Sequence, residues 1–266
     1  MEIHFYKYQG TGNDFVIVDN RDGRYSTLTT AQIHFICDRR KGIGADGMMM
    51  LNSREGYDFE MKYYNADGKE GSMCGNGGRC LVQFAHDRGI HKDHYHFIAF
   101  DGDHEAEIDR STGIVRLKMN DVNEVVKDRG DFILNTGSPH FIRMVHDVMS
   151  IDVFKQGRLI RYNEPFTKEG INVNFTENLG DDKIIVRTYE RGVEDETLSC
   201  GTGVTAASLM NYHNEHGFNC VQVQTKGGQL SVEFDRIDEE HFTNIWLCGP
   251  ALHVFEGDLI LKAPIS

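Results

Sequence analysis

Runs rich in β-branched and aromatic residues recur along most of the chain and predict that strands dominate its fold. A Met-rich run over residues 48–51 has the same character. The other predicted strands are Phe15–Asp19, Tyr57–Tyr64, Tyr95–Phe100, Ile114–Met119, Lys183–Tyr189, Val221–Thr225, Leu230–Phe234 and Asn244–Cys248.

Helical signals are fewer, and the first is a capping box. Thr29 is followed three residues later by Gln32, so each side chain can bond the other residue's backbone N–H. The apolar residues Ile33, Ile36 and Cys37 then share one face. A short helix is therefore predicted to begin after Thr29.

Three further helices are predicted. One covers residues 75–88 before Gly89, and another covers residues 201–216 before Gly217, because glycine commonly ends a helix. A fourth helix is expected after Ser150.

A repeated tetrapeptide opens the two longer helices. Cys-Gly-Asn-Gly at Cys74–Gly77 returns as Cys-Gly-Thr-Gly at Cys200–Gly203. A turn glycine follows each cysteine by 28 residues, as Gly102 in the first case and Gly228 in the second. Landmarks that share one register indicate an internal duplication.

A third landmark lies upstream of each cysteine. Thr11-Gly12 precedes the first motif by the same distance, to within one residue, as Thr136-Gly137 precedes the second. We therefore predict an α+β fold of two homologous domains related by a pseudo-two-fold axis. Each domain is expected to wrap a curved mixed sheet around its cysteine-initiated helix, with the connection near residues 120–131.

Composition narrows the class of protein. Hydrophobic residues make up 39% of the chain and charged residues 26%, which suffices for a buried core. The apolar runs are far shorter than the ~18 residues of a membrane span, and the first residues lack a secretory pattern. The formal net charge of −13 argues against nucleic acid as a partner, because phosphate binding needs clustered Lys and Arg. We expect a cytoplasmic protein whose six cysteines are thiols.

Cys74 and Cys200 are the strongest candidates for chemistry. Each stands just before a predicted helix, where unpaired N–H groups and the positive end of the dipole stabilise a thiolate. Under two-fold symmetry the two thiols would face each other across one substrate in the interdomain cleft. One thiolate would remove an α-proton while the opposing thiol delivers a proton to the other face. An isolated Cys-Gly is more often a buried helix start, but the duplication reverses that preference.

Other uses of these residue types fit the sequence less well. Either cysteine with His140 could form the pair of a cysteine protease, but a single nucleophile leaves the second cysteine unexplained. Cys80 is interpreted as a core residue, because it points away from Cys74 on the helix. The histidines of segment His91–His96 have a spacing that could suit a metal, but a solvated connection is preferred and no metal site is predicted.

No cofactor motif fits its required context. Gly42–Gly47 matches G-x-G-x-x-G, but it follows a helix-like segment and precedes a strand, the reverse of a dinucleotide site. A P-loop and a recognisable pyridoxal-phosphate lysine are absent from the sequence. We therefore predict a reaction that needs no cofactor.

Polar residues at turns could bind an amino acid. Asn13 follows a glycine turn, Asn65 stands at a strand end, and Glu190 with Arg191 stands at the equivalent strand end of the second half. Amide and carboxylate oxygens accept from an ammonium group, and arginine donates to a carboxylate as a fork. Turn formation explains the same residue types equally well, so both interpretations stay open here.

Together these motifs resemble those of the diaminopimelate epimerases, cofactor-independent enzymes of lysine biosynthesis. The resemblance extends over essentially the whole chain. Its motifs are Gly-Thr-Gly-Asn-Asp-Phe at 10–15, Gly-Ile-Gly-Ala-Asp at 42–46, Asn-Ala-Asp-Gly at 65–68, Cys-Gly-Asn-Gly-Gly-Arg-Cys at 74–80, Tyr-Glu-Arg-Gly at 189–192 and Cys-Gly-Thr-Gly at 200–203.

The resemblance implies a role for individual residues. Cys74 and Cys200 match the acid and base thiols of the family. The other matched positions are Gly75, Asn76, Gly201 and Thr202 around the reacting carboxylate, Asn13, Asn65, Asn172, Glu190 and Arg191 around the rest of the amino acid, and His140 with Ser138 as supporting residues.

The resemblance also implies the substrate, the assembly and the domain bounds. The family interconverts LL- and meso-diaminopimelate in the cytoplasm and commonly forms homodimers. Its C-terminal strand rejoins the first domain, so we expect one domain of residues 1–118 with 255–266 and another of residues 119–254.

Two positions depart from the family pattern. Gly47 stands where many members have Gln, and Ser138 stands where many have Asn. Neither position touches the thiols, so the departures bear on specificity and not on the reaction type. The alternatives are a racemase or epimerase of another amino acid, such as proline or hydroxyproline, and an amino-acid-binding module without catalysis.

Overall fold

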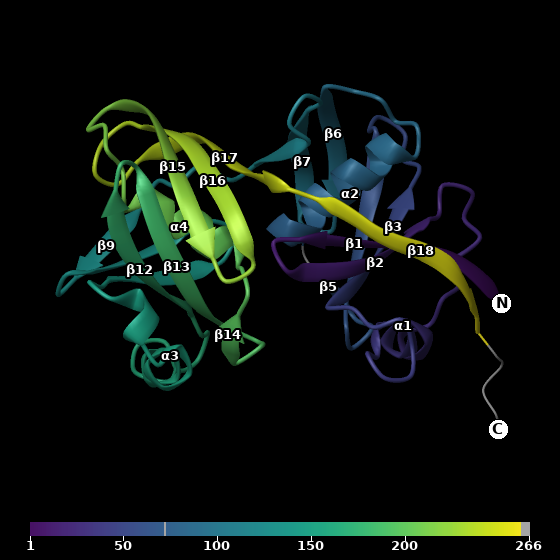
Figure 1. Cartoon of the computed structure of the whole chain (residues 1–266), viewed down its shortest axis with the longest axis horizontal. Coiled ribbons are helices and arrows are strands. Elements are labelled where there is room, and N and C mark those ends of the chain that lie inside the picture. Colours follow the sequence, from purple (N-terminus) through teal and green to yellow (C-terminus); the bar gives the residue numbers. More distant parts are fainter. Residues whose placement is uncertain (72, 262–266) are drawn as a thin grey trace. The chain divides into compact units, whose positions relative to one another are not determined.

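The computed structural model describes residues 1–71 and 73–261 and divides the chain into two compact units (Figure 1). Unit 1 holds Met1–Leu117 and the C-terminal stretch from Pro250, and unit 2 holds Lys118–Gly249. The domain bounds expected from the sequence fall one residue later at the first boundary and five residues later at the second.

Unit 1 contains nine strands and two helices among its described residues. Its elements are β1 (Glu2–Gly10), β2 (Asn13–Asp19), α1 (Thr30–Cys37), β3 (Gly47–Asn52), β4 (Phe59–Asn65), β5 (Glu70–Gly71), α2 (Gly75–Asp87), β6 (His94–Ala99), β7 (Gly102–Asp109), β8 (Ile114–Lys118) and β18 (Leu252–Ile260).

Unit 2 contains nine strands, two α-helices and one 3₁₀ turn. Its elements are β9 (Val125–Asp128), β10 (Asp131–Asn135), β11 (Pro139–Met144), η1 (Val148–Ser150), α3 (Val153–Arg161), β12 (Asn172–Gly180), β13 (Lys183–Glu190), β14 (Asp195–Thr197), α4 (Gly201–Leu209), β15 (Gly217–Thr225), β16 (Gly228–Arg236) and β17 (Phe242–Pro250).

The two units have the same order and pairing directions of strands, although β18 comes from the end of the chain and its counterpart β9 opens unit 2. In unit 1 the strands pair in the order β18-β1-β2-β3-β4-β6-β7-β8, with β5 added to β4. In unit 2 the order is β9-β10-β11-β12-β13-β15-β16-β17, with β14 added to β13. The parallel pairs, β2–β3 and β4–β6, recur as β11–β12 and β13–β15, and the other pairs are antiparallel. The predicted fold of two homologous halves with mixed sheets is confirmed.

The strand registers also agree, so residues of one unit can be matched to residues of the other. The matched pairs are Phe15–Gly47 with His140–Asn172, Met48–Tyr64 with Val173–Tyr189, and Met49–Tyr63 with Asn174–Thr188. Gly47 therefore occupies the place of Asn172, and by extension of the same register Asn65 occupies the place of Glu190.

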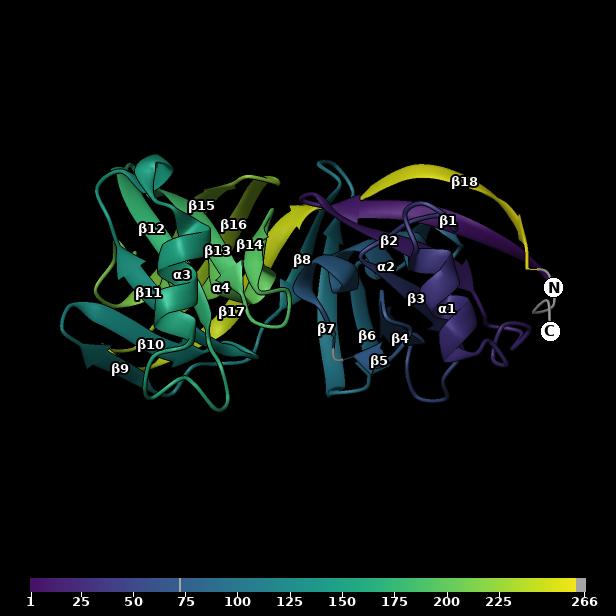
Figure 2. The same ribbon diagram turned by 90° about the horizontal axis from the view of Figure 1, so that it is seen from below.

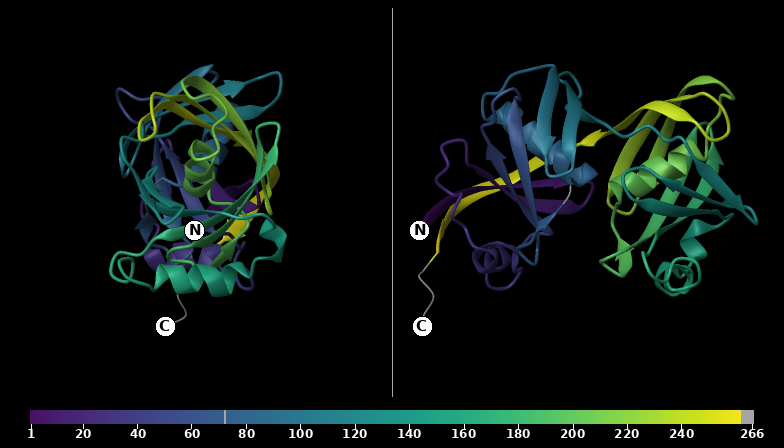
Figure 3. Two further views of the ribbon diagram at one scale, coloured as in Figure 1. Left: turned by 90° about the vertical axis from the view of Figure 1, so that its left-hand side faces the viewer. Right: turned by 180° about the vertical axis from the view of Figure 1, so that it is seen from behind.

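Each unit has one helix inside its curved sheet and one outside. Helix α4 contacts β11, β12, β13, β15 and β16, and Figure 3 shows it enclosed by these strands while α3 lies outside them. In the same way α2 packs on β1 to β4, whereas α1 contacts β3 from the other side (Figure 2). The two faces of the central strands therefore have different partners: the inner face meets α2 or α4, and the outer face joins the apolar core under α1 or α3.

Helix α1 forms as the sequence predicts. The Thr29 side chain accepts from the backbone N–H of Gln32, and the Gln32 side chain accepts from the backbone N–H of Thr29, which completes the capping box. The predicted helix after Ser150 also forms, as α3.

The prediction that α4 continues to residue 216 is wrong, because the helix ends at Leu209. The backbone N–H groups of His213 and Asn214 donate to the Asn219 side chain, at 3.0 and 2.8 Å, instead of to helical carbonyls. Asn side chains compete for backbone groups in this way, so a polar stretch after an apolar helix need not continue it. Gly217 begins β15.

Strand β12 was missed for an equally local reason. Its inward positions carry Asn172, Asn174 and Thr176, whose exposed fractions are 4%, 0% and 0%. An apolar–polar alternation cannot appear where the buried face is itself polar. The buried polar row marks the face that meets the start of α4.

Candidate functional site

Cys74 is the N-cap residue of α2, as the sequence predicts. Its backbone is extended, with φ −97° and ψ 131°, and the helix begins at Gly75. The Cys74 Sγ lies 3.6 Å from the Asn13 Oδ1, in the geometry of a thiol donor to an amide oxygen. The first helical residues, Gly75 and Asn76, are buried directly beside this thiol.

The orientation of the Asn13 amide is determined by its neighbours. Its Nδ2 donates to the Asp46 carboxylate at 2.5 Å, and a carboxylate only accepts. Its Oδ1 accepts from the Asn76 Nδ2 at 3.5 Å as well as from Cys74. The amide therefore presents oxygen, and not nitrogen, to the sulfur.

Asp46 is held in turn by Arg39. The Arg39 Nη2 lies 2.6 Å from the Asp46 carboxylate and 2.5 Å from that of Asp14. Burial raises the pKa of Asp14, but hydrogen bonds from Arg39 and Lys7 outweigh it and hold that pKa well below its usual range. The sequence alone does not indicate a functional role for Asp46, because Asp in a glycine-rich loop is typical of a turn.

A buried arginine supports the start of α2. The Arg79 side chain is fully buried and donates to the Asn76 Oδ1 and the Thr11 Oγ1, both at 3.1 Å, and to the Gly75 carbonyl at 3.3 Å. These bonds tie the β1–β2 turn to the first turn of α2 and fix the Asn76 amide. The signal in the sequence was a lone Arg inside an otherwise buried helix.

Cys200 is the N-cap residue of α4 and occupies the matched place in unit 2. Its backbone is extended, with φ −115° and ψ 111°, and its exposed fraction is 9%. The Cys200 Sγ lies 3.5 Å from the Thr202 Oγ1, which lies 3.1 Å from the Ser138 Oγ. The Thr202 backbone carbonyl also accepts from the Thr136 hydroxyl at 2.8 Å.

His140 lies behind this hydroxyl pair and is fully buried. Its Nε2 is 3.0 Å from the Ser138 Oγ and its Nδ1 is 3.0 Å from the Asn174 Nδ2. The Thr188 hydroxyl donates to the Asn174 Oδ1 at 2.8 Å, so Asn174 presents its N–H to His140. Burial, together with the positive charge of Arg191, lowers the pKa of His140 to about 3. The imidazole is therefore neutral, accepts at Nδ1 and carries its proton on Nε2.

Asn172 is the second residue that donates a hydrogen bond to the Ser138 hydroxyl. Its Oδ1 accepts from the Arg191 backbone N–H at 2.8 Å, so its Nδ2 is the group that donates to the Ser138 Oγ at 3.1 Å. Ser138 then accepts from both Asn172 and His140, and its own proton points to Thr202. The Thr202 proton is left to point to the Cys200 sulfur.

The two thiols thus have opposite surroundings. Cys74 faces an amide oxygen, an acceptor that suits a protonated thiol, whereas Cys200 faces a hydroxyl donor that suits a thiolate. Both sulfurs stand at helix N-termini, where the first N–H groups lack intrahelical partners and the dipole favours negative charge.

The ends of the matched strands carry the remaining predicted residues. Asn65 ends β4, where its side chain is exposed, and Glu190 ends β13. The Arg191 Nη1 donates to the Glu169 carbonyl at 3.0 Å, which aims the guanidinium. Gly201 is buried at the first turn of α4. Hydrogen bonds link Asn13 and Asn76 to Cys74 in unit 1, and they link Thr202, Ser138, His140, Asn172 and the Arg191 backbone to Cys200 in unit 2. Asn65 and Gly75 belong to unit 1, and Glu190 and Gly201 belong to unit 2.

Cys80 lies in the core, as the sequence predicts. Burial raises the pKa of both Cys37 and Cys80 to about 12, which leaves them as inert core thiols. His94 and His96 lie on β6 and meet different carboxylates, and the structure contains no group of three or more potential metal ligands among its described residues. The Gly42–Gly47 segment connects helix α1 to strand β3, which is the order a dinucleotide site excludes.

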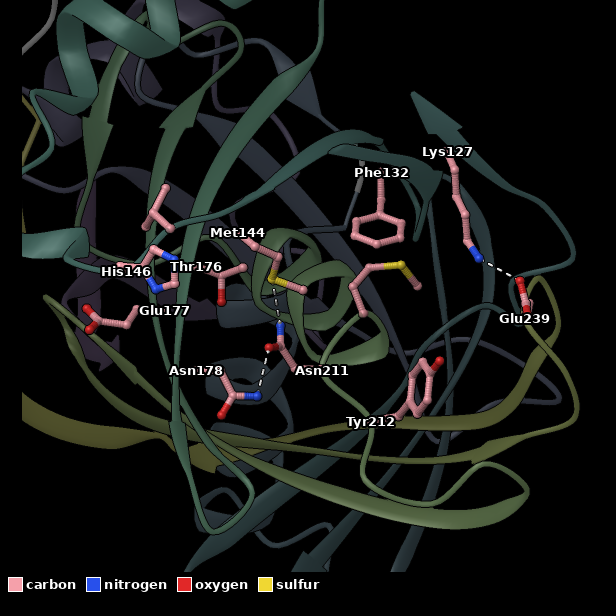
Figure 4. A pocket seen from close by; sticks show the side chains of 12 residues that line it. Lys127, Phe132, Met144, His146, Thr176, Glu177, Asn178, Asn211, Tyr212 and Glu239 are labelled. Atoms are coloured by element: carbon pink, nitrogen blue, oxygen red, sulfur yellow. Dashed lines mark hydrogen bonds and ion pairs between the residues drawn. The ribbon is translucent and has the colours of Figure 1, made fainter. Parts of the chain in front are cut away.

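A cavity of about 620 Å³ lies in unit 2 at the other end of α4 (Figure 4). Its walls include Met144, Asn211 and Tyr212, and Asn211 accepts a hydrogen bond from Asn178 at 3.3 Å. Cys200 stands at the N-terminal end of the same helix, so this cavity is separate from the thiol. No helix in the described ranges has the length and apolar character to span a membrane.

Comparison with known proteins identifies relatives that match almost end to end. The family model of diaminopimelate epimerase matches residues 5–129 and 132–254. The diaminopimelate epimerase of Flavobacterium psychrophilum is 46% identical over 255 residues, covering 96% of this chain and 99% of the relative. That of Chlorobaculum tepidum is 43% identical over 260 residues, covering 95% and 99%.

Solved structures show the same fold at low sequence identity. A PhzF-family phenazine biosynthesis protein of Bacillus anthracis superposes with a TM-score of 0.74 at 16% identity, covering 98% of this chain and 100% of that one. A hydroxyproline epimerase of Agrobacterium vitis, crystallised with trans-4-hydroxy-L-proline, gives a TM-score of 0.67 at 13% identity, covering 99% and 94%. At such identities the likeness supports the architecture alone.

Proposed function

Because the chain belongs to the diaminopimelate epimerase family, isomerases of lysine biosynthesis, we propose that it inverts one α-carbon of diaminopimelate with Cys74 and Cys200 as its acid and base. The observation that carries the residue assignment is the pair of matched N-cap cysteines, each the residue before an inner helix. The interconverted forms are LL- and meso-diaminopimelate.

The hydrogen bonds around the thiols support a direction for the first step. Cys200 accepts from Thr202 and starts as the thiolate, and Cys74 donates to Asn13 and starts as the thiol. The Cys200 sulfur takes the α-proton, and Cys74 gives its proton to the opposite face of the same carbon. Each turnover exchanges the two protonation states, so no proton is gained or lost and the reverse reaction uses the opposite pair.

The negative charge that develops on the substrate carboxylate needs donors that are already in place. The N–H groups at the starts of α2 and α4 would supply them, through Gly75, Asn76, Gly201 and Thr202. Electrostatic stabilisation of this kind replaces a cofactor that would otherwise accept the electron pair.

The other polar residues would fix the ends of the amino acid. Arg191 presents a cation suited to a carboxylate, and Glu190 presents an anion suited to an ammonium group. Asn13, Asn65 and Asn172 supply amides that can donate or accept. A substrate that carries an amino acid at both ends uses such a set fully, which favours diaminopimelate over proline.

The test is exchange of the α-proton with solvent. In D₂O the protein should incorporate deuterium at the α-carbon of LL-diaminopimelate and form the meso isomer. Cys74→Ser and Cys200→Ser should each lower kcat by about 10³-fold or more, because serine is a far weaker acid and base at neutral pH. Cys220→Ser, at a half-buried thiol outside the proposed set, is the matched control and should retain activity.

Three outcomes would contradict parts of the proposal. Full activity of either serine variant removes that cysteine from the mechanism. Exchange with proline or hydroxyproline, but not with diaminopimelate, replaces the substrate. Binding without any deuterium incorporation favours a module without catalysis.

The cellular compartment and the oligomeric state of the enzyme are part of the same proposal. We place it in the cytoplasm as a homodimer, on the basis of the family it belongs to. Light scattering of the purified chain would show twice the 30.2 kDa monomer mass if the dimer forms.

A further inference from the structure

The inner faces of the two sheets differ in polarity at matched positions. In unit 2 the face that meets the start of α4 carries His140, Asn172, Asn174 and Thr188, each with a polar side chain. The matched positions in unit 1 are Phe15, Gly47, Met49 and Tyr63. Tyr63 alone among these four brings a polar group to the face that meets α2.

Gly47 is the position where the difference is largest. Its counterpart Asn172 bonds both the Arg191 backbone and Ser138. A side chain could not project from Gly47, because its Cβ would lie 2.5 Å from the Tyr63 Cε2, 2.6 Å from the Tyr64 carbonyl oxygen and 2.9 Å from the Tyr63 hydroxyl oxygen. The Tyr63 hydroxyl therefore stands where a side chain of residue 47 would begin.

The packing around the Tyr63 ring aims this hydroxyl. The ring meets Phe15 edge-on, with centroids 6.1 Å apart. A Cβ added to Gly71, its partner on β5, would lie 3.2 Å from the Tyr63 Cδ1 and 2.8 Å from the Asn65 Nδ2. Glycines on both flanking strands thus let the ring lie across the sheet next to Asn65.

We propose that the Tyr63 hydroxyl is a substrate-binding group of unit 1, which hydrogen-bonds the same end of the amino acid as Asn65. This inference rests on the proposed function. Tyr63 supplies, from β4, the polar contact that residue 47 cannot supply from β3. A phenol is a donor and an acceptor, so it can meet either an ammonium or a carboxylate.

The neighbouring tyrosine provides a matched control. Tyr64 lies on the same strand but on the opposite face, where it packs against the apolar core under α1. Both tyrosines are partly exposed. Tyr63→Phe and Tyr64→Phe each remove one hydroxyl and keep the ring, so packing is preserved in both.

The experiment measures kcat and KM for LL-diaminopimelate with both variants, together with their melting temperatures. Tyr63→Phe should raise KM about tenfold or more, as expected for a lost hydrogen bond to a charged group, and leave kcat within about threefold. Tyr64→Phe should change neither constant. Similar melting temperatures for the three proteins would show that the KM effect is not a folding defect.

Two results would overturn the inference. If Tyr63→Phe has the wild-type KM while the wild type is active, Tyr63 does not bind substrate and the proposed function stands. If the wild type neither epimerises diaminopimelate nor exchanges its α-proton, the proposed function fails and this contact fails with it. A fall in kcat at constant KM would also contradict a contact made in substrate binding.

Discussion

At the scale of single residues, hydrogen-bond direction distinguishes two cysteines that the sequence presents as equivalent. Both are N-cap residues followed by glycine. Asp46 forces an oxygen of Asn13 towards Cys74, whereas His140 and Asn172 force a proton of Ser138 towards Thr202 and so towards Cys200. The groups that set this difference are remote in sequence from both motifs.

This difference predicts unequal reactivity of the two thiols. Cys200 should react with iodoacetamide at lower pH than Cys74, because the thiolate is the nucleophile. In Thr202→Val, which removes the hydroxyl beside the sulfur, the half-maximal pH for Cys200 should rise by about one unit, the size expected when a thiolate loses a donor. Peptide mass spectrometry across pH measures both sites, and Cys74 serves as the internal control. A lower half-maximal pH for Cys74 than for Cys200 would contradict the assignment.

His140 predicts a pH dependence of stability. Its pKa is about 3 in the folded protein, against 6.5 for an ordinary histidine, so between these values the unfolded chain binds a proton that the folded chain does not. The free energy of unfolding should therefore fall as the pH drops from 6.5 towards 3, by up to about 1.4 kcal/mol per unit from this group.

Urea unfolding at pH 7 and pH 5 tests this linkage. His140→Gln should lose stability at pH 7 but show a smaller difference between the two pH values than the wild type. His94→Gln, at a side chain that is 69% exposed, should leave that difference unchanged. Equal differences in all three proteins would mean that His140 is not buried in its neutral form.

At the scale of elements, local sequence signals predict a helix correctly where a single capping residue or glycine determines where the helix begins or ends. The capping box at Thr29 and the glycine after α2 are such signals, and α1 and α2 have nearly the predicted bounds. They fail for α4, where the Asn219 side chain accepts from the two backbone N–H groups that would continue the helix, and for β12, where the buried face is polar.

The capping box gives a prediction for α1. Thr29→Ala removes the acceptor of the Gln32 N–H at an exposed site, so it should lower the free energy of unfolding by about 1 kcal/mol without affecting kcat. Thr29→Ser keeps the acceptor and is the control. Equal losses in both variants would show that the methyl group, and not the hydrogen bond, stabilises the helix start.

At the scale of the whole molecule, the two duplicated units share a strand order but differ in the polarity of the side chains on their inner faces. Among the described residues, nine strands lie in the same spatial order in each unit with two α-helices, although edge strand β18 of unit 1 comes from the end of the chain and its counterpart β9 opens unit 2. The inner face is nevertheless polar in unit 2 and largely apolar in unit 1 at the matched positions. The proposed reaction uses this difference, since it needs one base and one acid and not two equal groups.

The two-base reaction requires both sulfurs to reach one carbon atom, which leads to a redox prediction. Mild oxidation should join Cys74 to Cys200 and abolish activity, and dithiothreitol should restore it. Mass spectrometry of unreduced peptides identifies the bridge, and Cys220→Ser should be inactivated as the wild type is. Full activity in protein that is completely bridged at these two residues would refute the mechanism.

The sequence by itself determined the duplication, the two cysteines and the family, because these depend on residue identity and spacing along the chain. It left Asn13 open between a turn residue and a binding residue, and it placed Asn172 and His140 among the candidate functional residues only through resemblance. The tertiary structure decided which atoms these residues present to the sulfurs, and it brought in Asp46, Arg79, Asn174 and Tyr63. Hydrogen-bond direction and the space above a glycine depend on strands that are neighbours in the sheet but distant along the chain.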